Sequence, residues 1–451
     1  MDLTRRAPTG RLVALVATTV LAVSACGFGS SATPSSSAAP STSGAPEKGT
    51  LVVWDQEVRN ANSPVIDQLN KQFEAAHPGV TIDRQSKSFD DLKATVKLAL
   101  KDPNGPDVAQ VNQGRPDMGA AVQAGLLLPL TDYAKKYGWD KRWGPSVLAR
   151  NSFSNDGKQF GTGSLYGVSM TGEIVGLFYN KAKFAQYGLT VPATFADLEK
   201  DFATIKAKGD VPVTFGAIDG DALQIYASIL ETLAGRAWLD EWIFGRSGQT
   251  FGTDQAKAAA ATIVEFSDKG YFTKDYAGMG YDDSWKLFAS GKGVFFWSGS
   301  WIGGDLVGAA GEKFGFFRTP PQTAGGPDLT IGGVGLPWAI RKTSTHADLA
   351  AEYLDYLTSD HAMELLAKAG VLPGHAAPNA VGRGALQNAM AAAFADANAK
   401  DEVGHYLDWA APTMWDTFKA QLGSLLAKKI TPGQFTVAID TEYQAFIASL
   451  K

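Results

Sequence analysis

Short apolar segments alternate with amphipathic helix patterns in the first part of this chain, and this alternation constrains its fold more than any other feature. Residues 50–54, 80–82 and 107–111 are apolar runs of strand length. Between them, residues 63–73 and 89–100 repeat apolar side chains at helical spacing. Strands that alternate with helices through short connections form parallel sheets, so the sequence predicts an α/β lobe.

The 451-residue chain is too long for one such lobe. A single hydrophobic core rarely grows beyond about 250–300 residues, so we expect two lobes. Further strands are predicted at residues 166–170, 175–179, 211–215, 294–297, 315–318 and 334–340. After residue 48, no apolar run reaches the roughly 18 residues that suggest a membrane-spanning helix.

The N-terminal 25 residues are typical of an export signal. Three arginines precede an apolar run at 12–23, which is too short to span a bilayer. The sequence Val-Ser-Ala-Cys follows at 23–26 and resembles the bacterial lipobox. That resemblance implies cleavage of residues 1–25 and lipid attachment to Cys26, the only cysteine. Residues 26–48, rich in Gly, Ser, Ala, Thr and Pro, are expected to be a flexible tether. The alternative is a secreted protein with a free thiol.

Charge and motifs exclude several classes of function. The formal net charge of -5, with no basic cluster, argues against a nucleic-acid partner. The five histidines are scattered without ligand spacing, so no metal is expected, nor is a cofactor. No hydrolase nucleophile elbow, zinc-protease motif or phosphate-binding loop is present. The acidic pairs Asp90-Asp91 and Asp282-Asp283 leave a glycosidase open, because the separation of two carboxylates is not readable from sequence.

Aromatic side chains stand beside polar ones where predicted strands end. Trp54 leads into acidic residues, and Trp301 follows a Gly-Ser turn. Open α/β sheets bind ligands at the carboxyl ends of their strands. A sugar offers apolar faces that stack on aromatic rings and hydroxyls that require hydrogen-bonding partners. This pattern therefore favours a carbohydrate ligand.

Ordered motifs then carry a family resemblance. They are Thr-Leu-Val-Val-Trp at 50–54, Gly-Pro-Asp-Val at 105–108, Ala-Gly-Leu-Leu at 124–127, Tyr-Gly-Val at 166–168, Glu-Ile-Val-Gly-Leu-Phe-Tyr-Asn-Lys at 173–181, Pro-Ala-Thr-Phe-Ala-Asp-Leu at 192–198, and Phe-Ala-Ser-Gly-Lys-Gly-Val at 288–294 running to Gly-Ser-Trp at 299–301. In this order the chain resembles the extracellular solute-binding proteins of carbohydrate ABC importers, the group that includes maltose-binding protein.

The resemblance implies a two-lobed, type II periplasmic-binding-protein fold of the α/β class. Each lobe is expected to be a mostly parallel sheet flanked by helices, with the ligand cleft at the hinge. The implied first lobe is 49–172 plus 319–365, and the second is 173–318 plus 366–451. Hinge crossings are expected near 171–174, 316–322 and 358–374.

Site residues follow from the same resemblance. Glu173 takes the position of a hinge glutamate that accepts bonds from sugar hydroxyls, and Trp301 and Trp415 take positions that stack on sugar rings. The polar candidates Gln113 and Arg115 follow the third strand. Asp55 and Glu57, which follow the first strand, are further candidates. Three more candidates match no family position and are included because aromatic and acidic residues of such a lobe commonly face the cleft, with a place in the core or on the surface as the alternative: Trp238, Asp283 and Trp338.

Two departures from the family pattern are visible. In maltose-binding protein an Asp-Arg pair occupies the loop after the third strand, whereas here Gly114 precedes Arg115. The acid of that pair is therefore either missing or displaced to Asp117. The proline of the family's Gly-x-Pro tripeptide is replaced by Ser169.

The expected function is capture of a mono- or oligosaccharide without catalysis. The expected partners are the transmembrane subunits of an ABC permease with its ATPase, and the protein is expected to be a monomer held by its lipid on the outer face of the plasma membrane. Two alternatives remain: a secreted glycosidase, or the same fold binding a polyamine, metal or peptide.

Overall fold

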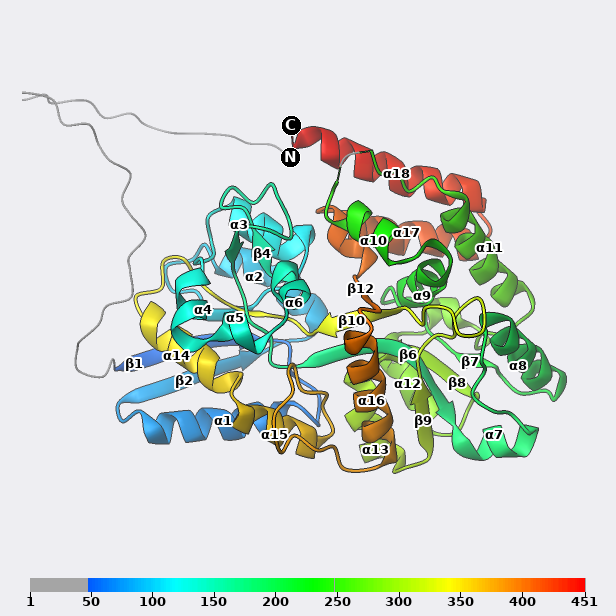
Figure 1. Ribbon diagram of the computed structural model, residues 1–451, viewed down its shortest axis with the longest axis horizontal. Coiled ribbons are helices and arrows are strands. Elements are labelled where there is room, and N and C mark those ends of the chain that lie inside the picture. The colour runs from blue at the N-terminus through cyan, green and yellow to red at the C-terminus, as the bar shows by residue number, and fades with distance from the viewer. Residues whose placement is uncertain (1–47, 247, 451) are drawn as a thin grey trace, which may run out of the picture. The chain divides into compact units, whose positions relative to one another are not determined.

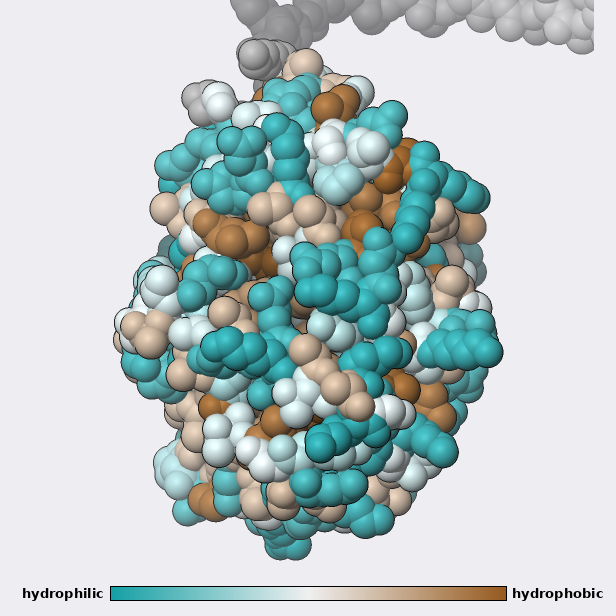
Figure 2. All heavy atoms as spheres, turned by 90° about the vertical axis from the view of Figure 1, so that its right-hand side faces the viewer, coloured by the Kyte–Doolittle hydropathy of each residue, from teal (hydrophilic) through white to brown (hydrophobic). Residues whose placement is uncertain are grey.

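The computed structural model describes residues 48–246 and 248–450. The expected signal segment, the tether and Cys26 lie outside the described residues, apart from Lys48. Within the described part, no helix is both long and apolar enough to cross a bilayer. Hydrophilic side chains predominate on the face shown in Figure 2, where hydrophobic ones are scattered in small patches.

The first sheet has four strands in the order β11-β3-β1-β2. β1 (Gly49–Asp55) pairs in parallel with β2 (Val80–Ser86) and with β3 (Val108–Gln110). β11 (Trp338–Ile340) joins β3 in the antiparallel sense. The predicted mostly parallel sheet is confirmed for this lobe.

Helices cover this sheet from two distant parts of the chain. α1 (Ser63–Ala76) and α2 (Phe89–Ala99) are the two predicted crossover helices. α14 (Ala347–Leu357) and α15 (Asp360–Ala369) return to pack on α1, as the yellow and blue ribbons of Figure 1 show. Their apolar faces form one buried cluster with β1 and β11.

Short elements complete this lobe between β3 and the hinge. A π-helical turn, η1 (Arg115–Gly119), leads into α3 (Ala120–Gln123). The others are α4 (Thr131–Tyr137), α5 (Trp139–Arg142), α6 (Pro145–Arg150), β4 (Ser152–Phe153) and β5 (Ser164–Leu165). The strand expected at 166–170 forms only an isolated bridge, Val168 to Trp338.

The second sheet is mixed, whereas a mostly parallel sheet was expected in each lobe. Its order is β12-β10-β6-β8-β7, with β9 also paired to β6. Its central strand β6 runs antiparallel to β8, β9 and β10. The strands are β6 (Gly172–Asn180), β7 (Val213–Thr214), β8 (Phe295–Gly299), β9 (Phe314–Phe317), β10 (Thr330–Val334) and β12 (Val403–Gly404). The mixture arises because the chain enters this lobe along β6 and the strands beside β6 run back toward the first lobe.

Helices make up most of the rest of the second lobe. They are α7 (Lys181–Tyr187), α8 (Phe195–Ala207), α9 (Ala222–Ala234), α10 (Arg236–Ile243), α11 (Asp254–Asp268), η2 (Tyr276–Gly278), α12 (Tyr281–Ala289), η3 (Ser300–Ile302), α13 (Gly303–Ala310), α16 (Ala385–Ala399), η4 (Leu407–Ala410), α17 (Met414–Leu426) and α18 (Pro432–Ser449). Side-chain caps fix several starts, for example Thr194 Oγ1, which accepts from Asp197 N at 3.1 Å at the start of α8.

Three chain segments lie side by side where the lobes join. Gly172 N donates to Leu372 O at 2.7 Å, and Gly335 N donates to Thr171 O at 2.9 Å. Because β10 belongs to the second sheet and β11 to the first, the strand pairing places the middle crossing at 335–337 and not at 316–322. The residue limits of the two lobes stay a prediction.

Candidate functional site

The two lobes meet along a line of contacts that we call the interlobe seam. On the first lobe it is formed by the loops after β1 and β3 and by α2. At one point Arg59 Nη1 reaches Asp305 Oδ2 on α13 at 3.4 Å. At another, a Cβ added to Gly114 would lie 2.6 Å from Trp409 Cα, so only glycine permits this approach of η4. Most of the predicted site residues lie on or beside this seam.

Glu57 is a buried carboxylate in the loop after β1. Its oxygens accept from Asn62 Nδ2 at 2.5 Å, Gln110 Nε2 at 2.8 Å and Gln56 Nε2 at 3.3 Å. Burial raises the pKa of Glu57, and the charge of Asp55 adds to the rise. Sequence reasoning missed Gln110, which lies inside β3 and holds this carboxylate.

Glu173 lies on β6 at the hinge. Tyr406 Oη donates to its Oε2 at 3.0 Å. Burial, reinforced by the charge of Glu57, raises the pKa of Glu173 to about 7, while Tyr406 and Arg150 oppose the rise. The structure therefore brings Glu57 and Glu173 close enough to influence each other.

Asp55 is committed to the protein itself. Arg84 contacts both of its oxygens, with Nε to Oδ2 at 2.7 Å and Nη2 to Oδ1 at 3.0 Å. Arg84 Nη2 also donates to Glu57 O at 2.9 Å. This bidentate pair sets the shape of the loop that carries Glu57.

Gln113 and Arg115 also make protein contacts. Gln113 Nε2 donates to Val334 O at 3.0 Å and Gly335 O at 2.9 Å, which ties the loop to the hinge. Arg115 donates to Lys158 O at 2.9 Å and, across the seam, to Phe244 O at 3.1 Å. Burial lowers the pKa of Arg115 to about 10.

Trp301 is a partly exposed ring held by its polar edge. Its Nε1 donates to Tyr281 Oη at 2.7 Å, and that hydroxyl lies 3.0 Å from Ser298 Oγ. The guanidinium of Arg59, from the other lobe, lies 5.4 Å from the centre of the Tyr281 ring. The Trp301 ring is therefore fixed within the second lobe by Tyr281, and Arg59 of the first lobe contacts Tyr281.

Trp415 lies near the start of α17, where elements of both lobes meet. The Lys93 ammonium is 4.7 Å from its ring centre, and the Phe89 ring stands edge-on at 6.3 Å. A Cβ on Gly220 would lie 2.9 Å from Trp415 Cζ2. The ring is thus enclosed by α2 and by the loop before α9.

Three predicted residues are not brought together with the others. Trp338 is 0% exposed in the first-lobe core, so no face is open for stacking. Trp238 stacks on Trp242, with ring centres 6.0 Å apart and planes 7° apart. Asp283 is exposed at the start of α12, whereas its neighbour Asp282 approaches Arg59 at 3.9 Å.

Comparison with known proteins decides the family. Residues 57–364 match the family of bacterial extracellular solute-binding proteins, and this range is more than half of the chain. The chain belongs to this family.

Individual relatives agree with this assignment. The multiple sugar-binding protein of Streptococcus mutans is 24% identical to this solute-binding protein over 307 residues, which is 66% of this chain and 69% of that protein. A chitin oligosaccharide binding protein matches with a TM-score of 0.77 at 20% identity over 89% of this chain and 99% of that one. The GacH receptor of Streptomyces glaucescens, solved unliganded and with acarbose, matches with a TM-score of 0.75 at 19% identity over 90% of this chain and 100% of that one. At these identities the structural matches show the fold, and they confirm the predicted two-lobed architecture.

Sequence reasoning missed an acidic loop of this solute-binding protein between β7 and α9. Asp221 Oδ2 is buried without a hydrogen-bond partner among the described residues. Burial, with the charge of Asp219, raises the pKa of Asp221 to about 8, and Arg59 and Lys419 oppose the rise. Asp219 Oδ2 accepts from Tyr281 N at 2.7 Å. The sequence could have indicated this loop, because Asp219 and Asp221 come after the end of β7, just as Asp55 stands at the end of β1.

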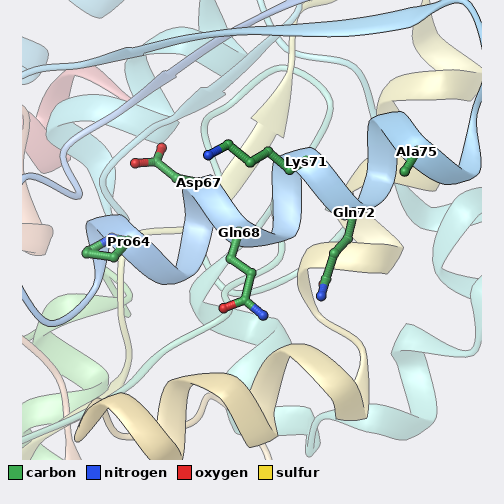
Figure 3. A pocket seen from close by; sticks show the side chains of 6 residues that line it. All are labelled: Pro64, Asp67, Gln68, Lys71, Gln72 and Ala75. Atoms are coloured by element: carbon green, nitrogen blue, oxygen red, sulfur yellow. The ribbon is translucent and has the colours of Figure 1, made fainter.

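Two hollows lie on the first lobe. The larger, of about 500 Å³, runs along α1, and all six residues labelled in Figure 3 come from that helix. Their side chains spread to both sides of α1, so they do not converge on a ligand. The smaller, of about 220 Å³, lies between α2, β3 and η1; we call it the α2 hollow, and its lining is Lys93, Ala94, Val96, Lys97, Leu100, Val111, Pro116, Asp117 and Ala121.

Proposed function

We propose that this protein is the substrate-binding component of an ABC importer and captures a mono- or oligosaccharide between its lobes. The family supports solute binding, and the Streptococcus mutans relative is named for binding sugars. The observation that carries the proposal is the fixed, partly exposed ring of Trp301 on a seam that also contains the carboxyl groups of Glu57 and Glu173. The second lobe adds Asp221, whose buried Oδ2 has no hydrogen-bond partner among the described residues. Stacking rings with buried acceptors suit a sugar.

Five side chains are proposed to contact the sugar. Glu57, Glu173 and Asp221 accept bonds from hydroxyls, while Trp301 and Trp415 stack on ring faces. The remaining polar candidates, Asp55, Gln113 and Arg115, would shape the site. Arg84 holds Asp55 in a bidentate ion pair, and the side-chain N–H groups of Gln113 and Arg115 donate to backbone carbonyls.

Closure follows from the placement of these groups. Glu57 comes from the first lobe, and Trp301 and Asp221 come from the second. A sugar that contacts both sides stabilises the closed arrangement by the difference between its affinities for the closed and open forms. Periplasmic binding proteins in general close around their ligands by such hinge motions, in which a few residues between the lobes absorb the change in backbone angles.

Capture requires no bond to break, so we propose that the protein is not an enzyme. A glycosidase needs two suitably spaced carboxyl groups, one with a raised pKa, and Glu57 and Glu173 are the pair that invites this alternative. Incubation of the bound sugar with the protein, followed by product analysis, is expected to return the sugar intact. Hydrolysed product would assign Glu57 and Glu173 a catalytic role.

Delivery and anchoring extend the proposal. The loaded protein would dock, as a monomer, on the transmembrane subunits of a permease that works with an ATPase. A lipid on Cys26 would hold it at the outer face of the plasma membrane. Mass spectrometry of the N-terminal peptide, before and after Cys26→Ser, tests the lipid.

A thermal-shift screen tests the ligand class. Mono- and oligosaccharides are compared with amino acids, polyamines and metal ions. A ligand at 100 times its dissociation constant adds about 2.7 kcal/mol to the free energy of unfolding, which raises the melting temperature by a few degrees. Shifts confined to the non-sugar solutes would contradict the sugar and leave the fold intact.

A further inference from the structure

Three charged side chains line the α2 hollow: Lys93, Asp117 and the exposed Lys97. Lys93 and Asp117 are the partly buried pair, and they do not form an ion pair with each other. Lys93 Nζ is buried and has no hydrogen-bond partner among the described residues. Asp117 Oδ2 accepts from Asn112 Nδ2 at 3.2 Å, and the structure records no ion pair between Asp117 and Lys93. Burying an ammonium that has no hydrogen-bond partner, near a carboxyl with which it forms no ion pair, is costly. The arrangement is suited to a group that bridges them.

Apart from the exposed Lys97, the rest of the lining is apolar. Val96, Leu100, Val111 and Ala121 are buried, and Pro116 joins them. At about 220 Å³ the hollow is smaller than the several hundred Å³ of a complete ligand pocket. It therefore suits one substituent of a ligand whose main body lies elsewhere.

The hollow adjoins a proposed stacking position. Lys93 lines it, and the ammonium of the same residue lies 4.7 Å from the ring centre of Trp415. Pro116 and Asp117 directly follow Arg115, which crosses the seam to Phe244. A sugar at Trp415 would thus lie close to Lys93, a lining residue of the hollow.

We propose that the α2 hollow is a subsite for the acetamido group of an N-acetylated sugar, an inference that rests on the proposed sugar-binding function. The acetyl oxygen accepts from Lys93, the amide N–H donates to Asp117, and the methyl group packs on Val96, Leu100 and Val111. An acetamido group is the common sugar substituent that offers an acceptor, a donor and a methyl together.

Other substituents match less of the lining. A carboxylate would pair with Lys93 but would be repelled by Asp117. An ammonium would pair with Asp117 but would be repelled by Lys93. A hydroxyl would satisfy one polar group and leave the apolar wall unfilled. The mixed lining therefore favours the neutral amide.

Calorimetric titration of the protein with matched sugars tests the subsite. Triacetylchitotriose and cellotriose share one linkage and differ in the acetamido or hydroxyl group at the second ring carbon. N-acetyllactosamine and lactose form a second pair on another backbone. The acetylated member is expected to bind at least about tenfold more tightly, since a site that hydrogen-bonds a group rejects the analogue lacking it.

Variants locate the preference. Lys93→Met removes the donor, Asp117→Asn weakens the acceptor by removing its charge, and Ala94→Leu narrows the hollow from an exposed position of α2. All three are expected to reduce the ratio between acetylated and unacetylated affinities. Ala75→Leu, at an exposed position in the other hollow on α1, is the matched control and is expected to keep the ratio. Melting temperatures near that of the wild type show that the variants fold.

The outcomes separate the subsite from the function. Equal or tighter binding of the unacetylated sugars would overturn the subsite and leave sugar capture standing. A preference that survives Lys93→Met, Asp117→Asn and Ala94→Leu would also overturn the subsite, because the acetamido group would then bind elsewhere. Binding of a non-sugar solute, with no response to any sugar, would overturn both.

Discussion

Trp301 and Trp415 were predicted to do the same task, yet the structure supports them in different ways. Trp301 is held inside its own lobe, through the bond from its Nε1 to Tyr281 at 2.7 Å. Trp415 takes its nearest aromatic and cationic neighbours from the other lobe, namely Phe89 and Lys93. The first ring is therefore oriented by its own lobe, whereas the second is enclosed by elements of both lobes.

This difference separates recognition from closure. A preorganised ring loses little conformational freedom on binding and contributes its stacking energy in full. A ring enclosed at the seam couples the sugar to the approach of the lobes. We therefore expect Trp301 to dominate affinity and Trp415 to dominate the extent of closure.

Replacing each tryptophan by alanine gives the largest expected effect. Trp301→Ala should weaken sugar binding by about 1–3 kcal/mol through lost stacking and burial. Trp415→Ala should weaken it less but reduce the compaction of the loaded protein, measured by small-angle scattering. Calorimetry supplies the affinities. Equal losses of affinity and compaction in the two variants would erase the distinction between the rings.

The acids Glu173 and Asp221 predict a pH dependence of similar size. Burial raises the pKa of Glu173 to about 7 and that of Asp221 to about 8. Because the folded protein holds these protons more tightly, their contribution to stability is fully present below the ordinary carboxyl range and is lost as pH rises through 7 to 8.

The melting temperature of the free protein should therefore fall across this window, and less so in Glu173→Gln and Asp221→Asn. A carboxylate is a stronger acceptor than a protonated carboxyl, so sugar affinity should fall as pH drops below about 7. Parallel titrations at several pH values measure the second effect. A flat profile would mean that neither acid contacts the ligand.

The sequence predicted the fold well because the fold depends on patterns of apolar residues. The alternation over 49–111 led directly to β1, α1, β2, α2 and β3. It did not predict the mixed second sheet, because an apolar run has no direction and β6 pairs with strands from distant parts of the chain.

The candidate site was less predictable because a side chain's partners are set by tertiary contacts. Asp55 and Arg115 are residue types that commonly contact ligands. In the structure, however, Asp55 pairs with Arg84, and Arg115 donates to the carbonyl of Phe244. Asp221 and Tyr406 lie in segments without a family motif, and their role depends on what lies opposite. Strand-end acids in both lobes were the one signal that could have found Asp221.

Removing the hydroxyl of Tyr281 tests whether the Trp301 ring is preorganised. Tyr281→Phe keeps the ring beneath Arg59 but leaves Trp301 Nε1 without its acceptor. Sugar affinity should fall by about 1 kcal/mol, the net value of a typical hydrogen bond. Tyr276→Phe is a suitable control, because its hydroxyl bonds Ser267 at 2.8 Å in another part of the lobe. An unchanged affinity in Tyr281→Phe would mean that packing alone orients the ring.

The smallest expected effect comes from Arg59, which joins the lobes on the Trp301 side. Its ion pairs to Asp305 at 3.4 Å and Asp282 at 3.9 Å are long. Asp305 is buried, so the substitution uses glutamine, which still offers that carboxylate an N–H donor. The pair with the mostly exposed Asp282 contributes about 0–1 kcal/mol and is screened by salt. Arg59→Gln should therefore weaken binding slightly at low ionic strength and not at all at high ionic strength.

The seam near Trp415 relies on ring contacts and on the bond from Arg115 to a carbonyl, so Phe89→Ala should show no such salt dependence. A salt-independent loss in Arg59→Gln would place Arg59 on the ligand itself, because a direct hydrogen bond to a neutral sugar is little affected by screening.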